Sequence, residues 1–168
     1  MGKHNQYECL WSWKHIRDGK VIFEFEDKPN ILVDEGEKAM VDTFFRKNAD
    51  LYFAADTFYI GLYSGTVVEA TVLATISEAS SNGGYARIAV ERSTVGFPTL
   101  DQHEGHWRVT SKEVTFTAAG GDIDAVNGAF LCTSSDGTGS LIGAVAAGTS
   151  RIIFSGDSSI VSLKFRQK

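Results

Sequence analysis

The nearest approach to a metal-binding pattern in this sequence is His103-Glu104-Gly105-His106. Two histidines three residues apart can share a metal ion on one face of a helix, but a zinc site needs three or four ligands. Gly105 and the strand-like run from Trp107 onward place this segment in a loop, and no further histidine or cysteine lies close in the sequence. We therefore interpret the segment as a polar surface loop and predict no metal site.

Hydrolase or phosphate-binding chemistry has no better support. The serine-rich residues 134–140 contain no Gly-x-Ser-x-Gly elbow and no histidine. The spacing of Gly137 and Gly139 is similar to that of a phosphate loop, but the segment precedes a strand, so no helix N-terminus would hold an anion. The pair Asp122 and Asp124 lacks the spacing of a calcium loop. We predict no catalytic residue and no cofactor, and the protein is not expected to be an enzyme.

Aromatic side chains offer a different chemistry, because sugar-binding modules use exposed tryptophan and tyrosine as stacking platforms. The chain has 3 tryptophans, 5 tyrosines and 11 phenylalanines. Tyr85 and Trp107 are the candidates for such a platform in a carbohydrate- or receptor-binding module. Aromatic residues at alternating strand positions are, however, more often core or subunit-interface residues.

Composition narrows the class of protein. The chain has 168 residues, 43% of them hydrophobic and 22% charged, which is typical of one soluble globular domain and long enough to bury a core. The formal net charge is −5 and the basic residues are scattered, so nucleic acid is not an expected partner. The N-terminal residues lack the apolar region of a signal peptide, and no apolar run approaches the roughly 20 residues that span a bilayer. We therefore expect a soluble protein, synthesised in the cytoplasm, with no membrane partner.

The two cysteines, Cys9 and Cys132, lie far apart in the sequence and have no metal-ligand spacing. Each falls at a strand-like position. We predict that both are buried free thiols, while a disulfide that ties the N-terminal segment to the main sheet remains an alternative.

An N-terminal β-hairpin is predicted by two alternating runs, residues 7–16 and 21–26, with Asp18-Gly19 between them. Two strands alone are marginally stable, so the aromatic face of this hairpin must pack on the main domain or on another subunit. We divide the chain into a hairpin arm at residues 1–33 and a sandwich domain at residues 34–168. The candidate contacts of the arm with a partner are Trp11, Trp13, Phe23 and Phe25.

One helix, at about residues 35–48, follows the arm. Met40, Val41, Phe44 and Phe45 recur at helical spacing and predict an apolar stripe that faces the core.

The rest of the chain reads as short strands separated by turns rich in Gly, Ser and Asp. We predict strands at about 57–64, 84–92, 107–117, 126–133, 140–146, 150–155 and 159–166, and interpret Asp157 as an ordinary turn residue. Residues 69–79 fit either one helical turn or an irregular crossing. Without a second helix for crossovers, the fold class is mainly β: an antiparallel β-sandwich or jelly-roll-like domain with one short α-helix and an N-terminal β-hairpin.

Several segments without chemistry of their own succeed one another in a distinctive order. A hairpin ends in residues 29–36 and leads into the helix, and a strand at 58–63 precedes the Gly84-Tyr85-Ala86-Arg87 block. Strands at 114–117 and 127–131 follow, and a Gly156-Asp157-Ser158 turn enters the last strand.

This order, from about residue 20 onward, resembles small β-rich structural proteins of tailed bacteriophage virions, of the head decoration (cement) or neck and tail accessory kind. The resemblance implies a non-enzymatic virion component and carries over no catalytic residue. As the leading function we expect capsid decoration that stabilises the head shell, and as alternatives a neck, tail fibre or baseplate component, or a carbohydrate- or receptor-binding module. The expected partners are other virion proteins, namely the major capsid protein or neck and tail subunits, and further copies in a homo-oligomer.

Overall fold

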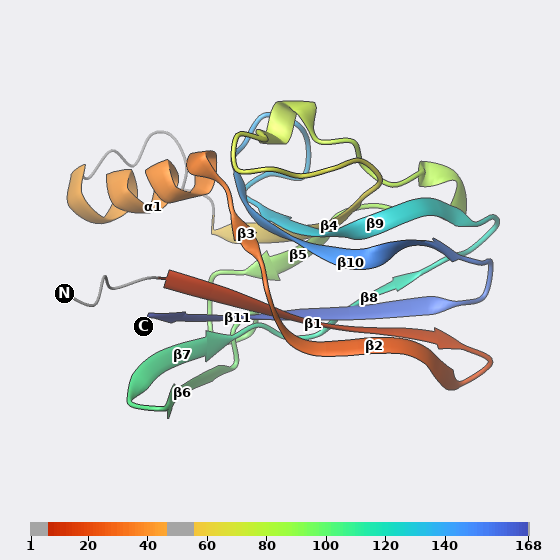
Figure 1. Ribbon diagram of the computed structural model, residues 1–168, viewed down its shortest axis with the longest axis horizontal. Helices are drawn as coiled ribbons and strands as arrows, with labels where there is room; N and C mark the ends of the chain where they lie inside the picture. The colour runs from red at the N-terminus through yellow and green to blue at the C-terminus, as the bar shows by residue number, and fades with distance from the viewer. Residues whose placement is uncertain (1–6, 47–55, 168) are drawn as a thin grey trace.

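Two antiparallel β-sheets, stacked one on the other, form the body of the molecule (Figure 1). The computed structural model describes residues 7–46 and 56–167. The first sheet has the strand order β2-β1-β11-β7-β6, with β8 also paired to β11, and the second has the order β3-β10-β9-β4-β5. The mainly β fold class that we predicted from the sequence is therefore confirmed, together with its helix and its hairpin.

The strands of the first sheet are β1 (Tyr7–Arg17), β2 (Lys20–Pro29), β6 (Thr99–His103), β7 (His106–Thr110), β8 (Val114–Thr117) and β11 (Ser158–Gln167). Those of the second are β3 (Ile31–Leu32), β4 (Thr57–Tyr63), β5 (Ile88–Glu91), β9 (Ile123–Cys132) and β10 (Leu141–Ile153). The α-helix α1 spans Asp34–Arg46, and two 3-10 turns occupy Leu73–Thr75 and Ser81–Gly83.

The main core lies between the facing sides of the two sheets. Because side chains alternate along a strand, every second residue of β1 and β11 faces the second sheet. Large side chains with almost no exposed surface meet there from both sheets, among them Trp11, Trp13, Val161, Leu163, Ile60, Leu62 and Leu131.

A smaller apolar cluster covers the other face of the second sheet. The segment that connects β4 to β5 crosses this face and buries Val67 and Leu73 against Phe130 and Tyr63. Its first 3-10 turn, at Leu73–Thr75, lies in the stretch for which the sequence left one helical turn or an irregular crossing open. The molecule therefore has three layers: the two sheets and this connection.

The N-terminal hairpin is an integral part of the first sheet. Asp18 and Gly19 at its turn have φ angles of 49° and 71°, as a two-residue turn with a type I′ twist requires. Strand β1 pairs not only with β2 but also with β11, continuously from Tyr7 to Ile16. The division into an arm at 1–33 and a domain at 34–168 stays a prediction, but residues 7–29 pack on their own chain.

Among the side chains of α1 that the structure describes, small residues lie against β10. Gly36 and Ala39 are buried, and the backbone of Ile142 lies so close to Gly36 that a Cβ atom at that position would clash with it. The prediction of a buried stripe is wrong at Val41, whose side chain is 57% exposed, while Met40 is half-buried. The side chains of Phe44 and Phe45 lie outside the described residues.

Some strand boundaries differ from the predictions for identifiable reasons. The segments predicted at 140–146 and 150–155 form the single strand β10, because Gly148, at φ 93°, and a register shift after Ala146 bend the strand without ending it. The segment predicted at 107–117 forms two strands, β7 and β8, on opposite sides of a short break. Strand β6, rich in polar residues and largely exposed, was not predicted.

Candidate functional site

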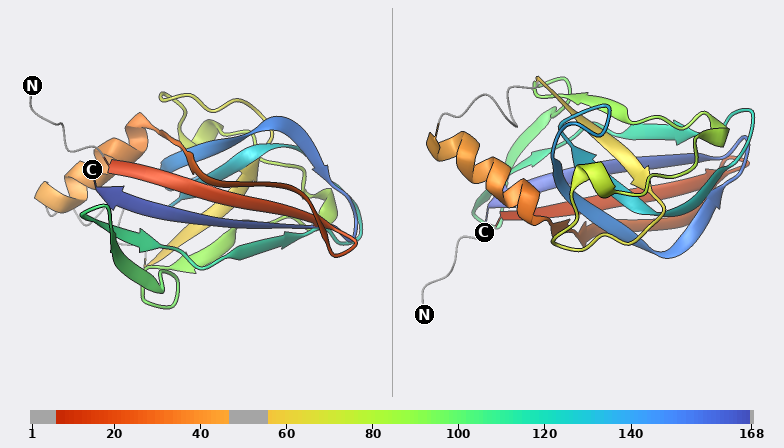
Figure 2. Two further views of the ribbon diagram at one scale, coloured as in Figure 1. Left: turned by 60° about the horizontal axis from the view of Figure 1, so that its bottom comes forward. Right: turned by 90° about the horizontal axis from the view of Figure 1, so that it is seen from above.

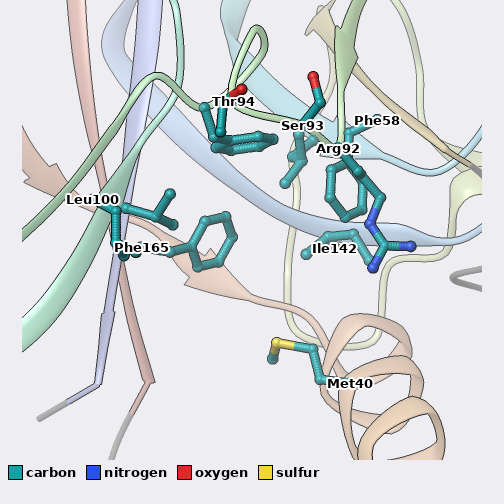
Figure 3. Close-up of a pocket in the computed structure, with 11 residues that line it drawn as sticks. Met40, Phe58, Arg92, Ser93, Thr94, Leu100, Ile142 and Phe165 are labelled. Atoms are coloured by element: carbon teal, nitrogen blue, oxygen red, sulfur yellow. The ribbon is translucent and has the colours of Figure 1, made fainter.

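Helix α1 lies at one end of the sandwich (Figure 2). An apolar pocket of about 560 Å³ opens beside it (Figure 3). Phe165 and Leu100 from the first sheet face Phe58 and Ile142 from the second, and Met40 reaches toward the pocket from α1. The loop after β5 contributes further residues, and the remaining lining side chains are Arg92, Ser93, Thr94, Phe97, Val109 and Leu131.

Apolar side chains continue from the pocket onto the surface. Leu100 is 68% exposed and Val95, in the loop after β5, is 65% exposed. Trp107 is 59% exposed and lies two residues before Val109 on β7, hence on the same face of that strand as a pocket residue. An exposed apolar surface of this kind on a soluble protein is typical of a contact with another macromolecule.

The pocket has little capacity for reaction chemistry. Among the described lining residues Arg92 is the one with a charged side chain, and its guanidinium lies 5.3 Å from the centre of the Phe58 ring. The same set of residues places no histidine or carboxylate beside the hydroxyl groups of Ser93 and Thr94. The arrangement suits the burial of apolar surface rather than proton or group transfer.

The four residues predicted as partner contacts lie on the inner side of the hairpin. The side chains of Trp11 and Trp13 are 0% and 1% exposed, inside the main core. Phe23 and Phe25 are half-buried and contact Trp13 edge-on. They lie at the open edge of the sandwich, where two cations cover them: the guanidinium of Arg151 lies 3.2 Å above the Phe23 ring, and the ammonium of Lys28 lies 5.2 Å from the Phe25 ring. A partner role for these four residues stays a prediction.

The Gly84-Tyr85-Ala86-Arg87 block forms a buried polar clamp. The Arg87 guanidinium pairs with the Glu78 carboxylate at 2.5 Å and donates to the carbonyl oxygen atoms of Ser134 (2.7 Å) and Asp136. The Tyr85 hydroxyl donates to Glu78 at 2.8 Å, and burial raises the pKa of this phenol. Tyr85 is half-buried and its ring packs against that of Phe116, so the ring is not an open platform for a sugar.

The serine-rich loop at residues 134–140 is tied down by this clamp and by its own turn. The Asp136 carboxylate accepts hydrogen bonds from the Thr138 hydroxyl and from the Ser134 hydroxyl, which hold its pKa at about 2. These hydrogen bonds give the loop a defined shape. Within the described residues no group of three or more His, Cys, Asp or Glu side chains could hold a metal ion.

The two histidines of the first motif flank the tip of the β6–β7 hairpin. Glu104 and Gly105 form the turn, with φ angles of 53° and 80°, and His103 pairs across it with His106. The turn favours glycine at position 105, because a residue with a side chain would be strained at this positive φ angle. The segment is thus a tight exposed turn, as its sequence indicated.

A buried His–Asp pair was missed by sequence analysis. Asp157, interpreted as an ordinary turn residue, is 4% exposed, and its carboxylate lies 3.1 Å from Nε2 of the buried His15. Arg17 donates to the same carboxylate at 2.9 Å. The Arg17 hydrogen bond is the main reason that the pKa of Asp157 is lowered, whereas burial lowers the pKa of His15. Only the pairing of β1 with β11 brings these groups together, so no local signal could have revealed them.

Both cysteines are buried free thiols, as predicted. Burial raises the pKa of each, that of Cys132 to about 11, so neither is a thiolate at neutral pH.

A comparison with known protein families shows to which family this chain belongs. A family described as podophage GP4 fiber I protein gp80 matches residues 32–164, which is most of the chain. The chain belongs to this family. It is therefore a structural protein of a phage virion, as the resemblance implied, and the family is one of fibre proteins. No curated protein and no solved structure matches it.

Membership of a fibre family changes the order of the predicted functions. Capsid decoration, the leading expectation, has no support from this match, and the tail fibre alternative is the better supported one. None of the described helices is long and apolar enough to cross a membrane.

Proposed function

We propose that this chain is a non-enzymatic component of a podophage tail fibre, and that the apolar pocket end attaches it to another protein subunit of the virion. The observation that carries the proposal is the match to a fibre protein family over residues 32–164. The pocket, with Leu100, Val95 and Trp107 around it, supplies the surface that such an attachment needs.

Apolar side chains at the pocket end are exposed to water, which costs free energy until a partner covers them. Exposed side chains of this size gain about 25 cal/mol for each Å² of apolar surface that a partner covers. A stable interface buries on the order of 800 Å² on each partner, with a few large apolar anchors at its centre. The pocket offers a cavity for such an anchor, and Trp107 and Leu100 offer anchors that project from the β6–β7 hairpin.

A phage that carries Leu100→Asp tests this proposal. The change places a charge at the mouth of the pocket, and since Leu100 is 68% exposed, the fold itself should tolerate it. The expected result is particles with normal heads and a strongly reduced amount of this protein, measured by mass spectrometry of purified virions. The matched control is Val68→Asp, which changes another exposed apolar residue (54%), in the connection after β4, and should leave incorporation unchanged.

Equal incorporation of the two variants would contradict attachment through the pocket. Incorporation of this chain into heads that lack tails would contradict the fibre assignment itself.

A further inference from the structure

A row of charged side chains crosses four neighbouring strands on the outer face of the first sheet. Glu8 on β1 lies opposite Arg166 on β11, which lies opposite Arg108 on β7, which lies opposite Asp101 on β6. The two arginines are thus side by side, with an acid on each flank. The ion pairs are short: Arg166 to Glu8 at 2.6 Å and Arg108 to Asp101 at 2.7 Å.

This row borders a polar pocket of about 210 Å³. Its lining is Glu8, Leu10, Asp27, His103, Glu104, Arg108 and Arg166. The side chains of Arg166 and Arg108 are only 12% and 19% exposed, and that of Glu8 is 19% exposed, so these groups are held in place by neighbours on a rigid sheet. Lys164 pairs with Asp27 at 2.5 Å, and Arg166 also reaches Glu104 at 3.2 Å. Charged groups fixed in this way around a concave surface form a pre-organised binding site.

The balance of charge decides the class of ligand. Among the described residues, four carboxylates around the pocket (Glu8, Asp27, Asp101 and Glu104) stand against three cations (Lys164, Arg108 and Arg166), with His103 beside them. A phosphate or carboxylate ligand would need an excess of positive charge, which these residues do not supply. A hydroxyl group can accept a hydrogen bond from a guanidinium and donate one to the paired carboxylate without breaking the ion pair.

We propose that this pocket binds an uncharged sugar unit of a surface polysaccharide through its hydroxyl groups. The binding chemistry follows from the pocket alone, and only the source of the sugar, the surface of the host cell, rests on the proposed fibre function. Arg108 and Arg166 donate to hydroxyl oxygen atoms, Glu8 and Asp27 accept from hydroxyl groups, and the buried Leu10 offers apolar contact at the floor.

Among the described residues that line the site there is no tryptophan, tyrosine or phenylalanine side chain on which a sugar ring could stack, and this sets the strength of binding. Trp107 precedes Arg108 on β7 and therefore projects from the opposite face of the sheet. Each site should bind one sugar unit weakly, and firm attachment would come from many copies that engage a repetitive polysaccharide at once.

Nuclear magnetic resonance of the ¹⁵N-labelled chain tests the proposal. The probes are the methyl glycosides of glucose, galactose, mannose, rhamnose and N-acetylglucosamine, each at millimolar concentration, with methyl glucuronoside as a charged comparator. The expected result is a saturable shift of the Arg108 and Arg166 side-chain N–H signals with at least one neutral glycoside. Arg108→Gln and Asp27→Asn should each raise the dissociation constant about tenfold, the effect of losing one hydrogen bond to a charged group.

The matched control is Lys14→Gln. Lys14 points from the same face of the first sheet, on β1, but does not line the pocket, so its replacement should leave binding unchanged. The proposal is overturned if no neutral glycoside shifts the arginine signals, if only the glucuronoside does, or if the control weakens binding as much as Arg108→Gln. Failure here leaves incorporation into the virion intact, whereas failure of the fibre assignment leaves sugar binding in solution intact.

Discussion

Replacement of Arg87 by methionine should destabilise the fold strongly, although Arg87 lies in a connecting segment. Its side chain is 5% exposed, and it holds the Glu78 carboxylate together with two carbonyl groups of the loop at residues 134–140. Removal of one partner of a buried ion pair costs about 3–5 kcal/mol, because the other charge is left unpaired. Since Glu78 is itself 32% exposed and can be partly hydrated, we expect about 3 kcal/mol, at the low end of this range.

A loss of this size should lower the melting temperature by roughly 6–12 °C for a chain of this length. Urea unfolding followed by tryptophan fluorescence measures the free energy directly. Glu78→Leu combined with Arg87→Met should cost clearly less than the sum of the two single changes, because the double variant leaves no unpaired charge. The loop should also become more sensitive to limited proteolysis in the single Arg87→Met variant.

The matched control is Arg108→Met, which breaks an ion pair with Asp101 on the outer face of the first sheet. The two side chains of this pair are 19% and 38% exposed, against 5% and 32% for those of Arg87 and Glu78. Water therefore screens this pair more, and the change should cost less than Arg87→Met. If Arg87→Met is no more destabilising than Arg108→Met, or if the two clamp mutations add without coupling, the clamp does not hold the loop and the reasoning is refuted.

Two further predictions concern the first sheet. The free energy of unfolding should fall as the pH drops from about 7 to 5, because burial lowers the pKa of His15 below the value of about 6.5 in the unfolded chain. His15→Gln should flatten this fall in urea unfolding at several pH values. An unchanged slope in the variant would contradict the prediction. A second fall should begin below about pH 4, where the lowered pKa of Asp157 no longer favours the folded state. Trp11→Ala should lower the free energy of unfolding by about 3–5 kcal/mol because the Trp11 side chain is fully buried, and Phe23→Ala should lower it by less. A Trp11 variant with unchanged stability and impaired virion assembly would favour the contact-arm hypothesis instead.

Local patterns were sufficient for the fold class. Asp18-Gly19 between two alternating runs predicted the first hairpin with its turn, and the only confident helical periodicity predicted α1 within two residues at each end. These features depend on neighbours in the sequence, so the sequence alone reveals them. The prediction for α1 was wrong at Val41, because the small residues Gly36 and Ala39 face β10 and allow the helix to approach it.

The candidate sites depend on contacts between distant residues, which periodicity does not contain. The polar pocket needs β1 beside β11 and β11 beside β7, which brings Glu8 next to Arg166 across the whole length of the chain. The apolar pocket likewise needs both sheets and α1 together. Trp11 and Trp13 became candidate partner contacts of a hairpin arm because local patterns could not place β11 beside β1, where it joins the hairpin to the rest of the sheet.

The central claim is that this chain is part of the tail fibre. Immunogold electron microscopy of intact particles, with an antibody against this protein, tests it most directly. The account predicts label confined to fibres at the tail, in several copies on each particle. Dense label over the head would contradict it and would return capsid decoration to first place.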